Sequence, residues 1–353
     1  MTTAYVLVTD LHCHYQDKEN RISYPREIDY VFEYLESVLS SYQARDFRVI
    51  PIFMGDIFDN GYRETVSGIQ VNNRFIELRN LCDSIYTVLG NHEVSFPKNN
   101  PFYTLVTEFN SEKVRGLRGK SIAPLGIFPV IDVVDRLEDG DIVFHFNHFA
   151  TPVSEPEAGK INIGLFHQEI VCNEILQEME QKFKGKLYGT KPLDFESSTL
   201  AGYDHCFFGH IHKVYGKWDW VSESTGKLCT LNYLASLGRP NVTEVMDSFL
   251  DRNIPAVIVE DGKFQKIEDN VFQLMTYSQC VKASVVQHQH EQYQYVKERQ
   301  VLRNYDPLSD VPIDNIFLRC VTDEERSLVR ELLDGKDSMT ESSLHDRYHA
   351  LCN

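Results

Sequence analysis

Four short runs of the chain combine side chains that bind divalent metal ions. They are Asp10-Leu11-His12, Gly55-Asp56-Ile57-Phe58-Asp59, Gly90-Asn91-His92-Glu93 and Gly209-His210-Ile211-His212. Each run follows an apolar stretch of strand length, so we expect its side chains just past a strand end, where distant segments converge on one crevice. A single run is weak evidence, but all of them in this order predict a two-metal site that hydrolyses phosphate esters.

The bridging ligand is expected to be Asp56. Two divalent ions about 3.5–4 Å apart need one ligand that contacts both, and a carboxylate has two oxygens for this role. The remaining ligands divide into two sets: Asp10, His12 and one imidazole of the last run for one ion, and Asn91, His167 and the other imidazole for the second. In an extended chain, the spacing of His210 and His212 would place both imidazoles on the same side.

A catalytic role is expected for His92, which is adjacent to a ligand but is not needed as one. The two ions would activate a water molecule for in-line attack on phosphorus. His92 would then donate a proton to the leaving oxygen, and Asp59 would orient its imidazole through the second ring nitrogen. The predicted catalytic residues are therefore His92 and Asp59.

His167 is assigned as a ligand from its position rather than from a motif. It directly follows the apolar stretch 161–166, and the two-metal scheme lacks one imidazole. His145 and His148 are rivals, but the alternation of the strand that carries them explains them as core or face residues. The other histidines are interpreted as non-ligands: His14, His205, His288, His290, His345 and His349.

The spacing of apolar residues predicts the elements that position these side chains. Parallel-type strands alternate with amphipathic helices in the first part: strands at 5–9, 49–53 and 85–89, and helices at 28–39 and 69–81. From Pro129 onward the pattern is richer in strands, with hairpin turns at 138–140 and 261–262. This order predicts an α/β (α+β) fold with two facing mixed β-sheets flanked by helices.

The composition is that of a globular protein, with 353 residues of which 42% are hydrophobic. No signal peptide and no apolar run of membrane-spanning length is present, so neither a secreted nor a membrane protein is expected. The eight cysteines are scattered, which suits reduced thiols in the cytoplasm. The formal charge of -17 disfavours strong DNA binding by the isolated chain, because such binding depends on Lys and Arg.

The motifs divide the chain into two expected parts. Residues 1–270 contain all of the motifs and form the predicted catalytic domain. Residues 271–353 carry no catalytic motif and form a predicted small C-terminal accessory or partner-docking region. Within it, the charged amphipathic segment 323–333 suits docking on another protein surface.

The ordered runs resemble the calcineurin-like metallophosphoesterase superfamily over roughly the first 240 residues. Within it, the chain looks like the nuclease subunit of DNA double-strand-break repair complexes, which has phage-encoded relatives. The finer similarity lies in Leu165-Phe166-His167-Gln168, in residues 203–213 and in residues 232–239. This resemblance implies two manganese ions, with iron or zinc as alternatives, and exo- or endonucleolytic cleavage of DNA. It also implies a coiled-coil ATPase as partner and leaves a homodimer open.

Three departures from that subfamily weaken the claim to DNA as substrate, and one of them, Glu93, favours a second hypothesis together with the acidity of the chain. Glu93 stands where the family usually has Asp, Asp59 stands where cellular nucleases often have His, and Ala235 replaces the Gly before Ser236. The alternative is a phosphatase or phosphodiesterase that acts on a phosphoprotein, a cyclic nucleotide or another small phosphate ester. A catalytically inactive scaffold is a third hypothesis, but its signature would be the loss of ligands, and all of the runs are complete.

Overall fold

The computed structural model describes residues 1–13, 25–58, 65–95, 102–115, 130–168, 199–212, 216–222, 225–238 and 251–273. The chain divides into two compact units, Met1–Ser284 and Val285–Asn353, and every described residue belongs to the first. The predicted segment 323–333 lies outside the described residues, and the predicted division at residue 270 stays a prediction.

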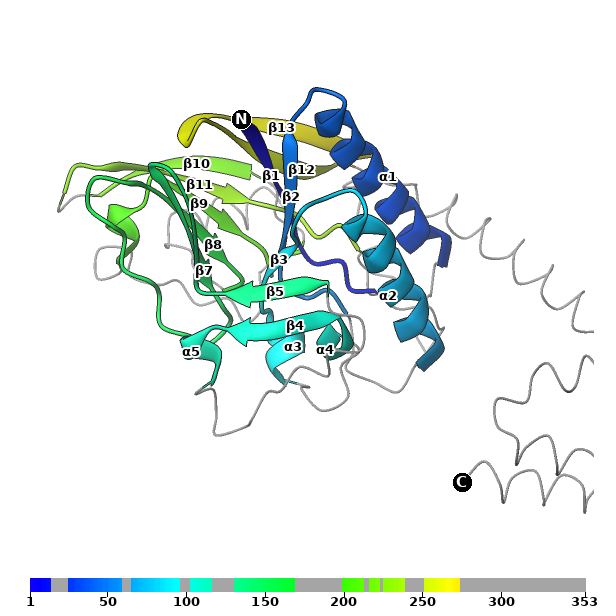
Figure 1. Cartoon of the computed structure of the whole chain (residues 1–353). Helices are drawn as coiled ribbons and strands as arrows, with labels where there is room; N and C mark the ends of the chain where they lie inside the picture. The colour runs from blue at the N-terminus through cyan, green and yellow to red at the C-terminus, as the bar shows by residue number, and fades with distance from the viewer. Residues whose placement is uncertain are drawn as a thin grey trace, which may run out of the picture. The chain divides into compact units, whose positions relative to one another are not determined.

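A seven-stranded mixed sheet forms one layer of the fold (Figure 1). Its order is β13-β12-β1-β2-β3-β5-β4, parallel from β1 through β4 and antiparallel where β12 pairs with β1 and β13. The strands are β1 (Thr2–Val8), β2 (Arg48–Met54), β3 (Tyr86–Val88), β4 (Val106–Asn110), β5 (Ile131–Val134), β12 (Asp251–Glu260) and β13 (Lys263–Gln273). The first three strands are parallel, so the motifs that follow them lie at one edge of the sheet.

Two long helices, α1 (Pro25–Gln43) and α2 (Thr65–Arg79), lie side by side against one face of this sheet (Figure 1). Phe32 of α1 and Phe75 of α2 are buried with their ring centroids 5.4 Å apart, and Phe75 also packs on Phe53 of β2. The two amphipathic helices predicted from spacing are therefore confirmed. The short helices α3 (Asn91–Ser95), α4 (Phe102–Leu105) and α5 (Glu112–Arg115) follow in the chain. Among the described helices, none has the length and apolar character needed to cross a membrane.

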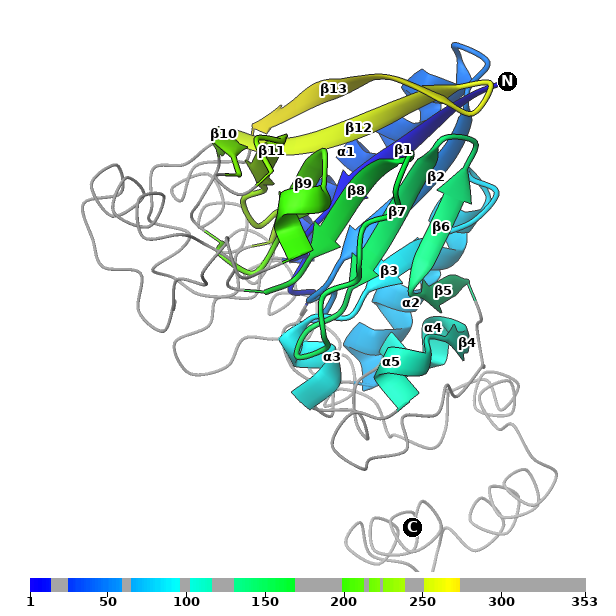
Figure 2. The same cartoon turned by 90° about the vertical axis from the view of Figure 1, so that its left-hand side faces the viewer.

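A six-stranded sheet forms the second layer, with the order β10-β11-β9-β8-β7-β6 (Figure 2). Its strands are β6 (Arg136–Asp139), β7 (Ile142–Asn147), β8 (Ile161–Phe166), β9 (His205–Phe208), β10 (Gly216–Val221) and β11 (Leu228–Tyr233), and the short 3-10 helix η2 (Thr199–Gly202) precedes β9. The hairpin predicted at 261–262 is present as β12–β13. The hairpin predicted around 138–140 is present with a different first strand: β7 pairs with β6 (Arg136–Asp139), whereas 131–134 is β5 of the first sheet.

The two sheets face each other across a shared apolar layer. Leu7 and Ile52 of the first sheet are buried in one cluster with Phe144, Phe146 and Phe207 of the second. The predicted fold class, two facing mixed sheets flanked by helices, is therefore confirmed. This packing fixes the ends of strands from both sheets relative to one another, which a site built from both sheets requires.

Candidate metal centre

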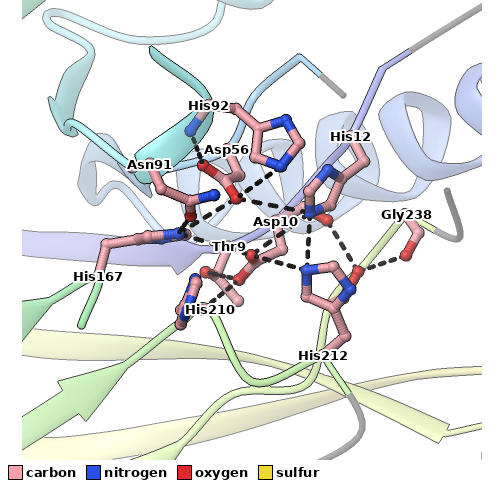
Figure 3. A network of polar contacts seen from close by, with 12 residues as sticks. Thr9, Asp10, His12, Asp56, Asn91, His92, His167, His210, His212 and Gly238 are labelled. Carbon is pink, nitrogen blue, oxygen red and sulfur yellow. Dashed lines mark hydrogen bonds and ion pairs between the residues drawn. The ribbon is translucent and has the colours of Figure 1, made fainter. Parts of the chain in front are cut away.

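The predicted metal ligands meet where strands of both sheets end (Figure 3). Asp10, Asp56 and Asn91 follow β1, β2 and β3 of the first sheet, while His167 and His210 follow β8 and β9 of the second. The segment after β1 runs beside the segment after β2, because the N–H groups of Asp10 and His12 donate to the carbonyls of Gly55 and Asp56. Segments far apart in sequence are thereby joined by backbone hydrogen bonds.

One ligand cluster consists of Asp10, His12, Asp56 and His212, whose ligand atoms all lie within 4.8 Å of one another. The Nε2 atoms of His12 and His212 are 2.8 Å apart. His212 Nε2 lies 3.4 Å from Asp10 Oδ1, and His12 Nε2 lies 3.7 Å from Asp56 Oδ2. Two imidazole nitrogens and two carboxylates that point at one small volume form a donor set suited to a divalent cation.

A second cluster consists of Asp56, His167 and His210, and Asn91 lies beside it. His167 Nε2 is 3.2 Å from Asp56 Oδ2 and 3.2 Å from Asn91 Oδ1. The other ring nitrogen, Nδ1, lies 2.6 Å from the carbonyl oxygen of Met54, which accepts its proton and leaves Nε2 as the ligand atom. Asp56 belongs to both clusters, which is the arrangement expected of the bridging carboxylate.

Asp10 supplies a direct test of whether these residues fit a metal ion. Its Oδ2 atom accepts hydrogen bonds from the Thr9 hydroxyl and from the N–H of His210, at 2.9 Å for the latter. Its Oδ1 atom is buried and forms no hydrogen bond with the described residues; the imidazole nitrogens of His212, His12 and His167 lie 3.4, 3.6 and 3.9 Å from it. A buried carboxylate oxygen that forms no hydrogen bond is costly unless a cation contacts it, so the site fits a metal ion between Oδ1 and these nitrogens.

Several of the ligand residues have backbone conformations that are uncommon for non-glycine residues and that the surrounding structure must stabilise. Asp10, Asp56 and His210 have positive φ angles of 49°, 49° and 74°, which non-glycine residues rarely adopt. The extended conformation expected for the last motif is therefore wrong. Since the chain turns at His210, its imidazole joins the second cluster while His212 joins the first.

Two glycines of the motifs allow segments to approach closely. A Cβ atom on Gly90 would lie 2.1 Å from Asp56 Oδ1, and one on Gly55 would lie 2.4 Å from His167 Nδ1. Gly55 also has a φ of 92°, which favours glycine. Glycine is needed at both positions because the side chains of Asp56 and His167 occupy the space that a Cβ atom would fill.

Burial and neighbouring charges act on the ligands in opposite directions. Burial alone would raise the pKa of Asp10 and Asp56, but His167 and the other imidazoles hold both pKa values below the usual range. Without a metal ion, burial would lower the pKa of His167, but Asp56 and Asp10 raise it to about 9, so an ion that binds Nε2 must displace a proton. Ionised carboxylates therefore persist in a buried site, which gives the site an affinity for cations.

The predicted catalytic histidine lies beside the shared carboxylate. The backbone N–H of His92 donates to Asp56 Oδ1 at 3.0 Å, and its Nε2 lies 3.8 Å from Asp56 Oδ2. The side chain of His92 is 22% exposed and that of His212 is 21% exposed, while those of Asp10 and Asp56 are at most 1% exposed. His92 thus stands between the buried ligands and solvent. Asp59, its predicted orienting partner, lies outside the described residues.

Glu93 has a role that the sequence did not indicate. Its carboxylate is buried and accepts backbone hydrogen bonds from Asp56, Ile57 and Gly90, each at 2.9 Å. Burial, followed by the charge of Asp56, raises the pKa of Glu93 to about 7. The residue therefore links the turn that carries Asp56 to the turn that carries Asn91 and His92, and it is not a ligand of either cluster.

The rival histidines lie outside both clusters. His145 Nε2 is 2.9 Å from Asn162 Oδ1 in the second sheet, and His148 Nδ1 accepts a hydrogen bond from the N–H of Leu89. The ring of His205 stacks on Phe264, with centroids 5.2 Å apart. These contacts agree with their interpretation as non-ligands. The other histidines interpreted as non-ligands, His14, His288, His290, His345 and His349, lie outside the described residues.

The described part of the stretch 232–239, residues 232–238, also reaches the site. The Ser236 hydroxyl and the Gly238 N–H both donate to the carbonyl oxygen of Asp10, at 3.0 and 2.9 Å. The N–H of Ser236 in turn donates to the carbonyl of His212. This segment therefore fixes the backbone on which two ligands of the first cluster stand.

The model of the calcineurin-like phosphoesterase family matches residues 4–214 of the chain. This range contains every predicted ligand. A search of curated proteins found no match.

A search of solved structures matched the chain to proteins that share little sequence with it. A 5'-nucleotidase precursor from Thermus thermophilus has a TM-score of 0.40 and 13% identity, covering 86% of this chain and 60% of its own length. A dimetal phosphatase from Danio rerio has a TM-score of 0.39 and 12% identity, covering 77% of this chain and 99% of its own. A sulfate thiohydrolase from Thermus thermophilus has a TM-score of 0.37 and 9% identity, covering 88% and 62%.

Proposed function

The chain belongs to the calcineurin-like phosphoesterase family, and we propose that it hydrolyses phosphodiesters with two divalent metal ions and that its substrate is DNA. The observation that carries the hydrolytic part is the sharing of Asp56 by two ligand clusters. Asp10, His12 and His212 would hold one ion with Asp56, while Asn91, His167 and His210 would hold the other. Manganese is the proposed metal, with iron and zinc as alternatives.

Different residues of the chain would perform different parts of such a reaction. When bound, the two ions would supply positive charge at the phosphoryl group and acidify the attacking water. His92 and His212 are the exposed members of the site, so the phosphate group would approach from their side. His92 would donate a proton to the leaving oxygen, and its backbone hydrogen bond to Asp56 keeps it next to the bridging carboxylate.

The DNA substrate is supported by the sequence resemblance around His167 and in residues 203–213. The formal charge of -17 implies that the isolated chain binds DNA weakly, because each phosphate contact on DNA normally uses a Lys or Arg. We propose that a coiled-coil ATPase provides the DNA-binding surface and that residues 271–353 dock on this ATPase. The described cysteines Cys13, Cys82, Cys206 and Cys229 are free thiols, which suits a cytoplasmic enzyme.

A second candidate function is hydrolysis of a phosphoprotein, a cyclic nucleotide or another small phosphate ester. Two observations favour it. The negative charge is less of an obstacle to a substrate that carries a single phosphate, because electrostatic repulsion grows with the number of phosphates. Glu93 also ends the third motif, in contrast to the Asp that is usual in the nuclease subfamily.

The deciding experiment compares substrates with the purified full chain and Mn²⁺. An end-labelled linear duplex, an aryl phosphodiester, a cyclic nucleotide and a phosphopeptide are assayed in parallel, with Asp56→Asn as the matched inactive control. The proposal expects weak release of nucleotides from the duplex, stimulated by a coiled-coil ATPase and suppressed steeply by salt. Efficient hydrolysis of the cyclic nucleotide or phosphopeptide without any DNA cleavage would replace the nuclease proposal by the second candidate.

A further inference from the structure

Leu89 lies between strand β3 and helix α3, which carries Asn91 and His92. Both of its backbone polar groups are bonded to the segment that follows β7 of the other sheet. Its N–H donates to Nδ1 of His148 at 3.0 Å, and its carbonyl accepts from the N–H of Phe149 at 2.8 Å. Leu89 and His148 are each 0% exposed. The segment that follows β7 therefore holds the chain immediately before Asn91 and His92.

The same histidine reaches a second ligand segment through its backbone. The carbonyl oxygen of His148 accepts a hydrogen bond from Gln168 Nε2 at 2.9 Å, and Gln168 directly follows His167. His148 thus contacts the chain two residues before Asn91 and one residue after His167. Both of these residues belong to the predicted ligand set of the second ion.

The orientation and protonation of His148 follow from its neighbours. Because Nδ1 accepts the Leu89 N–H, the proton of the neutral ring lies on Nε2, which is 3.5 Å from Asp135 Oδ1 without forming a hydrogen bond with it. Asp135 is itself held by the Ser111 hydroxyl at 2.6 Å and by the Glu112 N–H at 3.0 Å. Burial lowers the pKa of His148, which favours the neutral ring that can accept the Leu89 hydrogen bond.

We propose that His148 is a positioning residue whose hydrogen bond to Leu89 fixes Gly90 and the start of helix α3 for metal binding by Asn91 and proton donation by His92. A buried histidine that merely fills the core would affect stability alone, whereas the Nδ1 atom of His148 bonds the backbone two residues before Asn91. The bond to Gln168 uses the backbone carbonyl of residue 148 and is retained in any variant at this position. The inference rests on the proposed two-metal function, and its test therefore includes measurements that do not depend on turnover.

The test uses two substitutions at His148 and one matched control. His148→Leu removes the acceptor for the Leu89 N–H, whereas His148→Asn retains an oxygen at the place of Nδ1. His145→Leu is the control, because His145 is also buried, lies on strand β7 three residues before His148 and bonds to Asn162. All variants are made in the full chain and checked by circular dichroism.

Three measurements are made on each variant. Hydrogen exchange of the metal-free protein reports protection of the Leu89 amide, Mn²⁺ titration reports the affinity of the weaker site, and steady-state kinetics with an aryl phosphodiester separate kcat from KM. For His148→Leu we expect faster exchange at Leu89, weaker Mn²⁺ binding and a loss of about 10- to 100-fold in kcat, the scale for residues that orient metal ligands. His148→Asn should recover most of these losses, and His145→Leu should match the wild type in all three.

The outcomes separate this inference from the proposed function. Wild-type exchange, Mn²⁺ affinity and kcat in His148→Leu would overturn the positioning role, as would equal losses in His145→Leu or no recovery in His148→Asn. If the wild type binds Mn²⁺ but hydrolyses no phosphodiester, the proposed activity fails while exchange and Mn²⁺ affinity still decide the role of His148. If the wild type binds none of Mn²⁺, Fe²⁺ and Zn²⁺, both proposals are overturned.

Discussion

The Glu93 carboxylate accepts a hydrogen bond from the backbone N–H of Asp56, the residue that both ligand clusters share, at 2.9 Å. It also accepts from Ile57 and Gly90 at the same distance. Three backbone donors on one buried carboxylate hold the turns after β2 and β3 together, which fixes the bridging carboxylate relative to Asn91. Glu93 therefore contributes to the site by positioning its backbone.

Replacing Glu93 by Gln should weaken the site without abolishing the fold. Its amide can offer an acceptor at only one of the two oxygen positions, so at least one buried N–H loses its partner, at a cost of about 1–3 kcal/mol. We expect a lower melting temperature and weaker Mn²⁺ binding, measured by thermal unfolding and by titration with the metal. Glu93→Asp keeps the charge and should lie between Gln and the wild type. Unchanged Mn²⁺ affinity in Glu93→Gln would contradict this role.

Asp56→Asn should remove nearly all hydrolysis while the secondary structure stays intact. An amide offers one neutral oxygen in place of two charged ones, so it bridges two cations poorly. Initial rates with the aryl phosphodiester and far-ultraviolet circular dichroism measure the two effects. Wild-type turnover in this variant would show that Asp56 is not the shared ligand.

His92 and His167 should fail in different ways when each is changed to Ala. His92 lies 3.8 Å from Asp56 Oδ2 at the exposed side of the site, so its loss should leave metal binding intact and lower kcat by about 100-fold or more. His167 is buried between Asp56 and Asn91, so its loss should remove one ion. Metal content by mass spectrometry and kcat separate the two cases, and the reverse pattern would mean that the roles are exchanged.

The ion pair between Arg45 and Glu268 should stabilise the fold in a pH-dependent way. Its two N–O distances are both 2.9 Å, and the hydrogen bond from Arg45 is the largest effect that lowers the pKa of Glu268 to about 2. A carboxylate whose folded-state pKa lies below its unfolded value stabilises the fold above the unfolded pKa, and this contribution disappears as pH falls toward the folded pKa.

Urea unfolding of Glu268→Gln measures this contribution. Since the Arg45 side chain is 45% exposed, we expect a loss of about 1 kcal/mol or less at neutral pH. The difference from the wild type should shrink as the pH is lowered toward the folded-state pKa of about 2. Asp83→Asn, which removes the more exposed pair with Arg48, serves as control and should change stability less. A larger effect of Glu268→Gln in acid than at neutral pH would contradict the assignment.

The sequence was sufficient for the elements that lead into the site. The apolar runs 49–53 and 161–166 correspond to β2 and β8. A short continuous apolar run is typical of a strand that is buried on both faces of a sheet, so it predicts such a strand directly. The helical spacing of Val31, Phe32 and Leu35 likewise corresponds to the buried face of α1. These features depend on residues close to one another in the chain.

The parts of the site that sequence did not reveal depend on contacts between distant segments. A lone Glu93 or His148 has no spacing that distinguishes a ligand from a residue bonded to backbone N–H groups. Their roles became apparent only when the turns after β2 and β3 and the segment after β7 were placed together. The positive φ of His210 similarly separates two histidines that the sequence alone would place on one side of a strand.

The most direct test of the two-metal site is the Mn²⁺ stoichiometry of the metal-stripped full chain, measured by equilibrium dialysis together with hydrolysis of an aryl phosphodiester. The shared position of Asp56 in both ligand clusters predicts two ions per chain at saturation, with activity that disappears on chelation and returns with Mn²⁺. Asp56→Asn in the same experiment should bind fewer than two. A wild type that saturates with fewer than two ions, or that hydrolyses the diester equally well after chelation, would contradict the two-metal account.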